Sequence, residues 1–224
     1  MDAKSSDLYN LENTIAAPLL VRFEYPWEAL AHIADFIREV GPTLDPEEFD
    51  NPQPEVWIAK DAKILPSAYI TGPLIIDHGA EVRHCAFIRG KAIVGKGAVV
   101  GNSVELKNSI LFDKVQVPHY NYVGDSILGF KAHMGAGAVT SNLKSDRSLV
   151  VVKAADGEEI ATGLKKFGAM LGDNVEVGCN SVLCPGSVVG AGTHVYPLSR
   201  VRGFVPAGKI FKTPDNIVDL LPQE

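Results

Sequence analysis

Large apolar residues recur at every sixth position through the first half of the chain. A small residue, usually alanine, stands two positions before most of them. The series is Ile58, Ile64, Ile70, Ile76, Val82, Ile88, Val94, Val100, Leu106 and Phe112. A period of six matches neither a helix nor the two-residue alternation of a half-buried strand. It is typical of a parallel β-helix, in which six residues form one short strand and one corner.

The same period returns near the other end of the chain. The second series is Leu171, Val177, Leu183, Val189 and Val195. Between the two series Pro118 falls where an apolar residue is due, and the phase resumes with Leu128 and Met134. Such a slip predicts a bulge or a protruding corner. We expect functional residues there, because irregular corners project side chains that uniform coils do not.

The segments outside the coils predict three further elements. Residues 26–40 have the pattern of a helix, with Pro26 near its start and Gly41 after its end. We expect this helix to cover the N-terminal end of the stack. Residues 143–170 interrupt the repeat with a hairpin around Asp156-Gly157, which is interpreted as a flap beside a site. The predicted organisation is an N-terminal segment 1–55, a β-helix 56–212 with the inserted loop 143–170, and a tail 213–224.

Composition limits the function classes. The chain has 224 residues, a formal net charge of −6 and 46% hydrophobic residues. An acidic chain argues against a nucleic-acid partner, although local basic spots remain suited to a small anion. No apolar run is long enough for a membrane span, and no signal peptide is visible. Three cysteines without metal-ligand spacing, of which Cys85 is expected to be packed, indicate a reducing, cytoplasmic setting.

Two basic residues are predicted to stack on one face. Arg89 and Lys107 are eighteen residues apart, which is one coil of three hexads, and each follows an inward apolar residue. Two stacked cations repel, so a phosphate between them would relieve the cost; two solvated surface bases are the alternative. His119 lies at the slip among polar and aromatic neighbours, a place suited to a general base.

A metal centre is a weaker hypothesis. His78 and His84 are one hexad apart and should lie on different faces, and no pair of histidines has the spacing of two ligands on one coil. We therefore predict no metal, and a zinc hydratase of the γ-carbonic-anhydrase type is the least favoured alternative. The glycine-rich corner around Gly135 and Gly137 permits close approach of a ligand, and its N–H groups are candidates to stabilise an oxyanion.

Several strings resemble a known family. VGNSVELKNS, VPHYNYVGDSILG and MGAGAVTSN are similar to the acetyltransferase domain of bifunctional N-acetylglucosamine-1-phosphate uridyltransferase. With YPWEAL, TGLKKFGAMLGDNVEVG and LCPGSVVGAGTHVYP, they also resemble the C-terminal half of archaeal-type sugar-1-phosphate nucleotidyltransferases. The resemblance runs from about residue 24 to 212 and implies a left-handed β-helix that forms homotrimers with sites between subunits. The glycine-rich nucleotide-binding segment of the nucleotidyltransferase half is missing, so uridylyl transfer is not predicted.

The resemblance also implies roles for individual residues. His119 matches the general base and Asn142 the residue near the reacting amine, while Arg89, Lys107 and Tyr122 match contacts to the sugar phosphate. Ala136 matches a backbone contact to acetyl-CoA. His133 replaces a substrate-binding Asn, Leu143 replaces a Tyr, and Cys179 replaces a Ser near acetyl-CoA. Lys212 is a candidate for the CoA phosphates.

These observations predict acetyl transfer from acetyl-CoA to the amine of glucosamine or galactosamine 1-phosphate, without a covalent enzyme intermediate. The alternative from a different class is a non-catalytic β-helix that binds or regulates a sugar-nucleotide enzyme. The isolated half-enzyme and the substitutions at His133 and Leu143 keep that alternative open.

Overall fold

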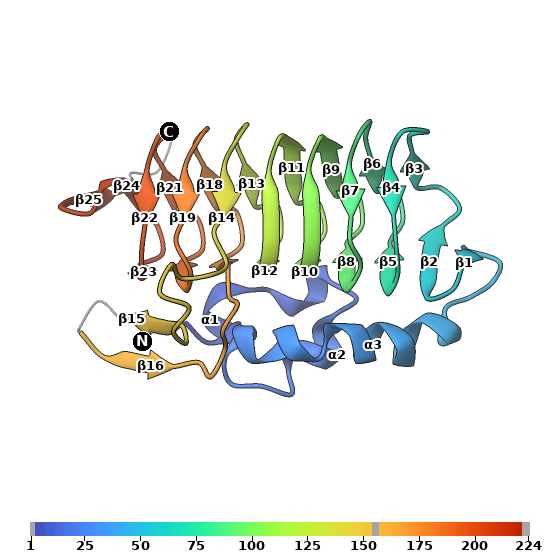
Figure 1. The fold of residues 1–224 in the computed structure, drawn as a ribbon, viewed down its shortest axis with the longest axis horizontal. Coiled ribbons are helices and arrows are strands. Elements are labelled where there is room, and N and C mark those ends of the chain that lie inside the picture. The colour runs from blue at the N-terminus through green and yellow to red at the C-terminus, as the bar shows by residue number, and fades with distance from the viewer. Residues whose placement is uncertain (1–2, 154–156, 221–224) are drawn as a thin grey trace.

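The computed structural model describes residues 3–153 and 157–220. Short parallel strands stack into a β-helix with three faces (Figure 1). Face one is formed by β2 (Val56–Ala59), β5 (Leu74–Ile76), β8 (Ala92–Val94), the C-terminal parts of β10 (Glu105–Leu111) and β12 (Tyr122–Leu128), β17 (Ala169–Leu171), β20 (Ser187–Val189) and β23 (Phe204–Val205). This architecture confirms the fold class predicted from the hexads.

The other two faces are built in the same way. Face two is formed by β4 (Tyr69–Ile70), β7 (Phe87–Ile88), the N-terminal parts of β10 and β12, β14 (Val139–Thr140), β19 (Val182–Leu183) and β22 (Arg200–Val201). Face three is formed by β3 (Lys63–Ile64), β6 (Glu81–Val82), β9 (Val99–Asn102), β11 (Gln116–His119), β13 (His133–Met134), β18 (Glu176–Val177), β21 (His194–Val195) and β24 (Lys209–Thr213). The inward apolar residues of all three faces form one continuous core.

The coils change length in the middle of the stack. Ile76 pairs with Val94, eighteen residues on, but Val94 pairs with Leu111, only seventeen residues on. The register therefore slips before Phe112, at the corner that β10 passes through, and not at Pro118. Phe112 is buried at the next corner against the ring of Tyr9. The hexad series conceals the slip because both Leu111 and Phe112 are apolar.

Face one is apolar on its outer side as well as its inner side. Its outward residues are fully buried and pair in one row: Ile75, Ile93, Ile110, Ile127, Met170 and Val188. The N-terminal segment covers this row with α1 (Ser5–Leu8), η1 (Leu11–Asn13), α2 (Ala17–Leu20), η2 (Pro26–Ala31), α3 (Ile33–Val40) and η3 (Gly41–Thr43). Helix α3 contacts β5, β8 and β10, and η2 contacts β12. Covering the row removes a large apolar surface from water.

The predicted position of the N-terminal helix is therefore wrong. The helix lies along the flank of the stack, as Figure 1 shows, because the outward row on face one needs a cover. The first coil is instead bordered by β1 (Phe49–Gln53), which pairs antiparallel with β2. At the other end, β25 (Asn216–Asp219) pairs antiparallel with β24.

The inserted loop contains the predicted hairpin. Strands β15 (Val151–Lys153) and β16 (Glu159–Ala161) pair antiparallel. Asp156 of the predicted turn lies outside the described residues, whereas Gly157 has a φ of 87°. Cys85 is exposed rather than packed, because it lies at a corner in a left-handed backbone conformation. Within residues 3–153 and 157–220, no helix has the length and apolar character needed to cross a membrane.

Candidate functional site

His119 lies on the corner between faces three and two. Parallel pairing places the same corner position of successive coils in register, which defines a histidine column of His84, Asn102, His119, Ala136 and Cys179. The column runs along the stack. His119, the predicted general base, therefore stacks in register with Ala136 and Cys179, the residues predicted to lie near acetyl-CoA.

The backbone at His119 is held firmly while its ring is exposed. The His119 N–H donates to Asn121 Oδ1 at 3.1 Å, and the Asn121 amide nitrogen donates to the carbonyls of Gly135 and Ala138 at 2.8 and 3.0 Å. Asn121 is only 2% exposed. The imidazole has no hydrogen-bond partner in the described part of the chain, so it is available to a substrate. Asn121 is a supporting residue that the sequence analysis missed.

The glycine corner offers fewer free donors than predicted. The Gly135 N–H donates to the carbonyl of Val177 and the Gly137 N–H to that of His119, at 2.7 and 3.0 Å. Both groups belong to the coil ladder, so neither of these two N–H groups is free to stabilise an oxyanion. The N–H groups of Ala136 and Cys179, by contrast, have no acceptor among the residues that the structure describes. The Ala136 N–H is thus a better candidate than those of Gly135 and Gly137 for a backbone contact to a ligand.

Lys212 lies near the C-terminal end of the histidine column. Phe211 pairs with Val195, which places Lys212 next to Tyr196 at the same corner. The Lys212 ammonium lies 5.5 Å from the centre of the Tyr196 ring. A cation over an aromatic face is held by the negative charge of the ring face. The candidate cofactor residues therefore follow one edge of the molecule.

Arg89 and Lys107 lie on the other edge of face two, at the corner with face one. The predicted stacking is confirmed, since Ile88 pairs with Leu106 and the Arg89 N–H donates to the Leu106 carbonyl at 2.9 Å. Each cation has its own carboxylate. Arg89 Nη1 lies 2.7 Å from Glu105 Oε1, and Lys107 Nζ lies 3.0 Å from both oxygens of Asp125. The two cations therefore do not need a bridging phosphate to coexist.

Asp125 is the centre of the polar cluster at this corner. Its side chain is 5% exposed and also accepts from the amides of Asn108 and Asn142, at 2.8 and 2.5 Å. Asn108 and Asp125 both have a left-handed backbone, with φ values of 50° and 49°. Asn and Asp tolerate that conformation better than most residues. We name Lys107, Asn108, Asp125 and Asn142 the polar row.

Tyr122 joins the polar row to face two. Its phenol oxygen accepts a hydrogen bond from the Asn142 amide at 3.1 Å. The ring lies over Gly124, where an added Cβ would come within 2.5 Å of the Tyr122 hydroxyl. Burial, and then the negative charge of Asp125, raise the pKa of Tyr122 above its ordinary value. The phenol therefore stays neutral at neutral pH and can donate to an anion.

His133 is not brought to either cluster. It lies on face three, in register with Gln116 and Glu176, and its Nδ1 is 2.7 Å from Glu176 Oε2. His119 and the polar row are also separate, because the strands of face two lie between their corners. No hydrogen bond or ion pair in residues 3–153 and 157–220 connects the His119 side chain to Arg89, Lys107 or Asn142.

The sequence analysis missed Glu105, Asn108 and Asp125. A signal for two of them exists, since Asn108, Asp125 and Asn142 are each seventeen residues apart, which is the length of the shortened coils. For the metal hypothesis, His78 Nδ1 lies 3.1 Å from Asp61 Oδ1 and His84 Nδ1 lies 3.1 Å from Ser67 Oγ. Among the described residues, no three His, Cys, Asp or Glu side chains gather as a metal site would require.

Comparisons with known proteins place these features in a family. The family model described as "GMPPB C-terminal domain" matches residues 70–189. The bifunctional sugar-1-phosphate nucleotidylyltransferase/acetyltransferase of Sulfurisphaera tokodaii is 35% identical over 158 residues, which are 70% of this chain and 39% of that protein. The bifunctional protein GlmU of Methanococcus aeolicus is 39% identical over 95 residues, which are 42% of this chain and 23% of that protein.

A shorter relative is matched over more of its length. The uncharacterized acetyltransferase YaiX of Escherichia coli K12 is 30% identical over 154 residues, which are 69% of this chain and 66% of that protein. These relatives confirm the resemblance inferred from the sequence. The chain spans about two fifths of the archaeal nucleotidylyltransferase/acetyltransferase and about a quarter of GlmU.

Proposed function

Because this chain belongs to the family of the GMPPB C-terminal domain, whose model matches residues 70–189, we propose that it is an acetyltransferase. The proposed donor is acetyl-CoA and the proposed acceptor is the amine of a hexosamine 1-phosphate, either glucosamine or galactosamine 1-phosphate. The relatives named as acetyltransferases support the reaction class.

One observation carries the proposal. The exposed imidazole of His119 stacks in register with the Ala136 and Cys179 corners, whose N–H groups have no acceptor among the described residues. A thioester carbonyl at the Ala136 N–H would find a hydrogen-bond donor for its developing negative charge. His119, one coil away from Ala136, is placed to accept a proton from the attacking amine.

The reaction then needs no covalent enzyme intermediate. The acceptor nitrogen attacks the thioester carbonyl while His119 removes its proton. The carbon–sulfur bond breaks, and the CoA thiolate leaves and takes up a proton. Tyr122, Arg89 and Lys107 are proposed to hold the sugar phosphate, which orients the amine.

The separation of the two clusters supports a site between subunits. His119 and the polar row lie at opposite edges of face two in one chain. A neighbouring copy that places its polar row against His119 would complete the site. We therefore propose a homotrimer with its sites between subunits. We also propose that the protein is cytoplasmic.

The test is release of free thiol from acetyl-CoA by the purified chain with each hexosamine 1-phosphate. We expect thiol release with one or both acceptors. N-acetylglucosamine 1-phosphate is the matched control, because its nitrogen is already acetylated and should give no release. Equal thiol release with and without an amine acceptor would contradict the proposal.

A specific observation favours the second candidate, a non-catalytic β-helix that binds or regulates a sugar-nucleotide enzyme. The two cations proposed to bind phosphate are already paired with Glu105 and Asp125, so their corner has no excess positive charge. This candidate predicts no thiol release with any acceptor. It also predicts that a separate nucleotidyltransferase changes its rate when the chain is added.

A further inference from the structure

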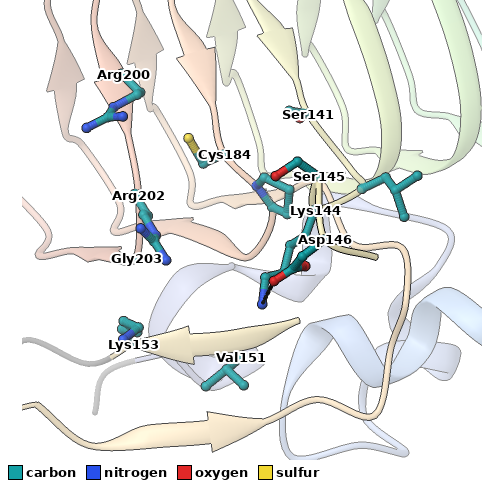
Figure 2. Close-up of a pocket in the computed structure, with 12 residues that line it drawn as sticks. Ser141, Lys144, Ser145, Asp146, Val151, Lys153, Cys184, Arg200, Arg202 and Gly203 are labelled. Carbon is teal, nitrogen blue, oxygen red and sulfur yellow. Dashed lines mark ion pairs between the residues drawn. The ribbon is translucent and has the colours of Figure 1, made fainter. Parts of the chain in front are cut away.

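A cavity of about 440 Å³ lies between the inserted loop and the last coils (Figure 2). It is distinct from the histidine column, because it lies at the corner between faces two and one. Its lining residues are Ser141, Leu143, Lys144, Ser145, Asp146, Val151, Lys153, Cys184, Pro185, Arg200, Arg202 and Gly203. The volume is within the range of small-molecule sites.

The outer wall of the cavity is fixed by strand alternation. Val150 and Val152 are 1% and 0% exposed, so they anchor β15 in the core. The alternate residues Val151 and Lys153 then face the cavity. An added Cβ at Gly186 would lie 2.6 Å from Val150 Cγ1, and one at Gly203 would lie 3.2 Å from the Lys153 carbonyl oxygen. The hairpin is therefore packed closely against the coil corners and forms a built wall.

The lining is basic on a protein of net charge −6. Four cations, Lys144, Lys153, Arg200 and Arg202, line the cavity with one carboxylate, that of Asp146. Figure 2 shows Lys153 on the hairpin and Arg202 on the coil opposite it. Lys153 pairs with Glu159, and Lys144 contacts Ser148 and Asp146.

The two arginines differ from the other cations of the cavity. Neither Arg200 nor Arg202 has a carboxylate partner in the described part of the chain, whereas Arg89 and Lys107 are both paired. Two exposed guanidinium groups at one concave surface repel each other unless an anion lies between them. A guanidinium matches phosphate oxygens with two parallel hydrogen bonds.

We propose that this cavity binds the diphosphate group of a nucleotide, with Arg200, Arg202 and Lys153 as its cationic contacts. Lys153 is paired with Glu159 and Lys144 with Asp146, so the two arginines supply the unmatched positive charge, and the volume leaves room for the attached nucleoside. The site uses neither His119 nor the polar row; with CoA as the ligand the inference rests on the proposed function, and with another nucleotide it lies beyond acetyl transfer. The nucleotide is either CoA, which contains a diphosphate, or a nucleoside diphosphate sugar.

The experiment is calorimetric titration of the full chain with inorganic pyrophosphate at low salt. The R200Q/R202Q double variant should weaken the pyrophosphate affinity by about tenfold or more. The matched control is Arg147→Gln, an exposed arginine of the inserted loop outside the lining, which should change the affinity by less than about twofold. Absence of saturable binding, an equal loss in the control, or orthophosphate binding as tightly as pyrophosphate would overturn the proposal.

Competition then identifies the source of the diphosphate. If CoA displaces pyrophosphate and the double variant raises KM for acetyl-CoA, the ligand is the co-substrate. If a nucleoside diphosphate sugar displaces pyrophosphate and KM for acetyl-CoA is unchanged, the ligand is a separate nucleotide. If neither displaces pyrophosphate, the nucleotide proposal is wrong. Binding is measured without turnover, so a negative thiol assay would leave this result intact.

Discussion

The two corners that border face two are built in opposite ways. At one edge, the polar row is half-buried or buried, and its lysine, carboxylate and amides are all paired within the chain. At the other edge, the histidine column is open, and the His119 ring has no partner among the described residues. One corner has its polar groups satisfied by the fold, and the other leaves the His119 ring for a ligand.

The difference follows from the cost of burying charge. A carboxylate as buried as Asp125 is tolerated only when cations and donors surround it, and three side chains provide them. The shortened coils bring those side chains into register. An exposed imidazole has no such cost and can keep its lone pair free for proton transfer. We therefore expect substitutions at the polar row to affect stability and substitutions at His119 to affect rate.

The largest expected effect is on turnover, from His119→Ala. Loss of the general base should lower kcat by about 10²–10⁴. The free energy of unfolding should change by less than about 0.5 kcal/mol, because the ring is exposed. Thiol release and urea unfolding measure the two quantities. Unchanged turnover would contradict the proposed role of His119 as the general base.

His84→Ala is the matched control for that substitution. His84 is also exposed and occupies the same corner position two coils earlier, where its Nδ1 lies 3.1 Å from Ser67 Oγ. It should retain full turnover. Co-assembly of H119A with Arg89→Glu should restore part of the activity if one subunit supplies the histidine and another the phosphate contacts. Failure to recover any activity in mixed oligomers would place both residues in the same subunit.

The next largest effect is on stability, from Asp125→Ala. This change leaves Lys107, whose side chain is 22% exposed, without its carboxylate, and it removes the acceptor of two amides. Breaking a buried pair in this way costs about 3–5 kcal/mol of unfolding free energy, measured by urea denaturation. Asp146→Ala is the control, since its carboxylate is 64% exposed, and it should cost less than about 1 kcal/mol. Normal stability with lost turnover would instead indicate that Asp125 contacts the substrate.

The sequence predicted the coils and the stacking of Arg89 on Lys107 because inward apolar residues repeat with the period of the fold. It did not predict the flank cover, although the outward row is visible as an apolar residue directly before an inward one. Ile75, Ile93 and Ile110 directly precede the inward residues Ile76, Val94 and Leu111. Hexad counting follows only the inward positions and therefore ignores a buried outer side.

The candidate site was predicted less completely than the fold. The register slip was placed two corners late, at Pro118 and His119, because Phe112 continues the apolar series after a residue has been lost. The pairing of Lys107 with Asp125 depends on that register, and Glu105 was not considered as a partner of Arg89, so charge alone suggested an unneutralised pair. The proposed completion of the site by a neighbouring subunit would be a property of assembly, and one chain's periodicity does not contain it.

The smallest expected effect comes from Tyr122→Phe at the junction of the two corners. Loss of the acceptor for the Asn142 amide should cost about 1 kcal/mol near neutral pH. Burial and Asp125 raise the pKa of Tyr122 in the folded chain, so its contribution is fully present below the unfolded pKa of about 10. It is lost as the pH rises through that value toward the folded pKa.

The wild type and the Phe variant should therefore converge in stability at alkaline pH. The gap in unfolding free energy measured at about pH 8 should shrink by about pH 10.5, because only the wild type must lose the proton of Tyr122 when it unfolds. Tyr9, whose pKa burial also raises, is present in both proteins and cancels in the difference. A gap that stays constant across this range would show that the phenol is solvated. Tyr122 would then belong with the open histidine column rather than with the polar row.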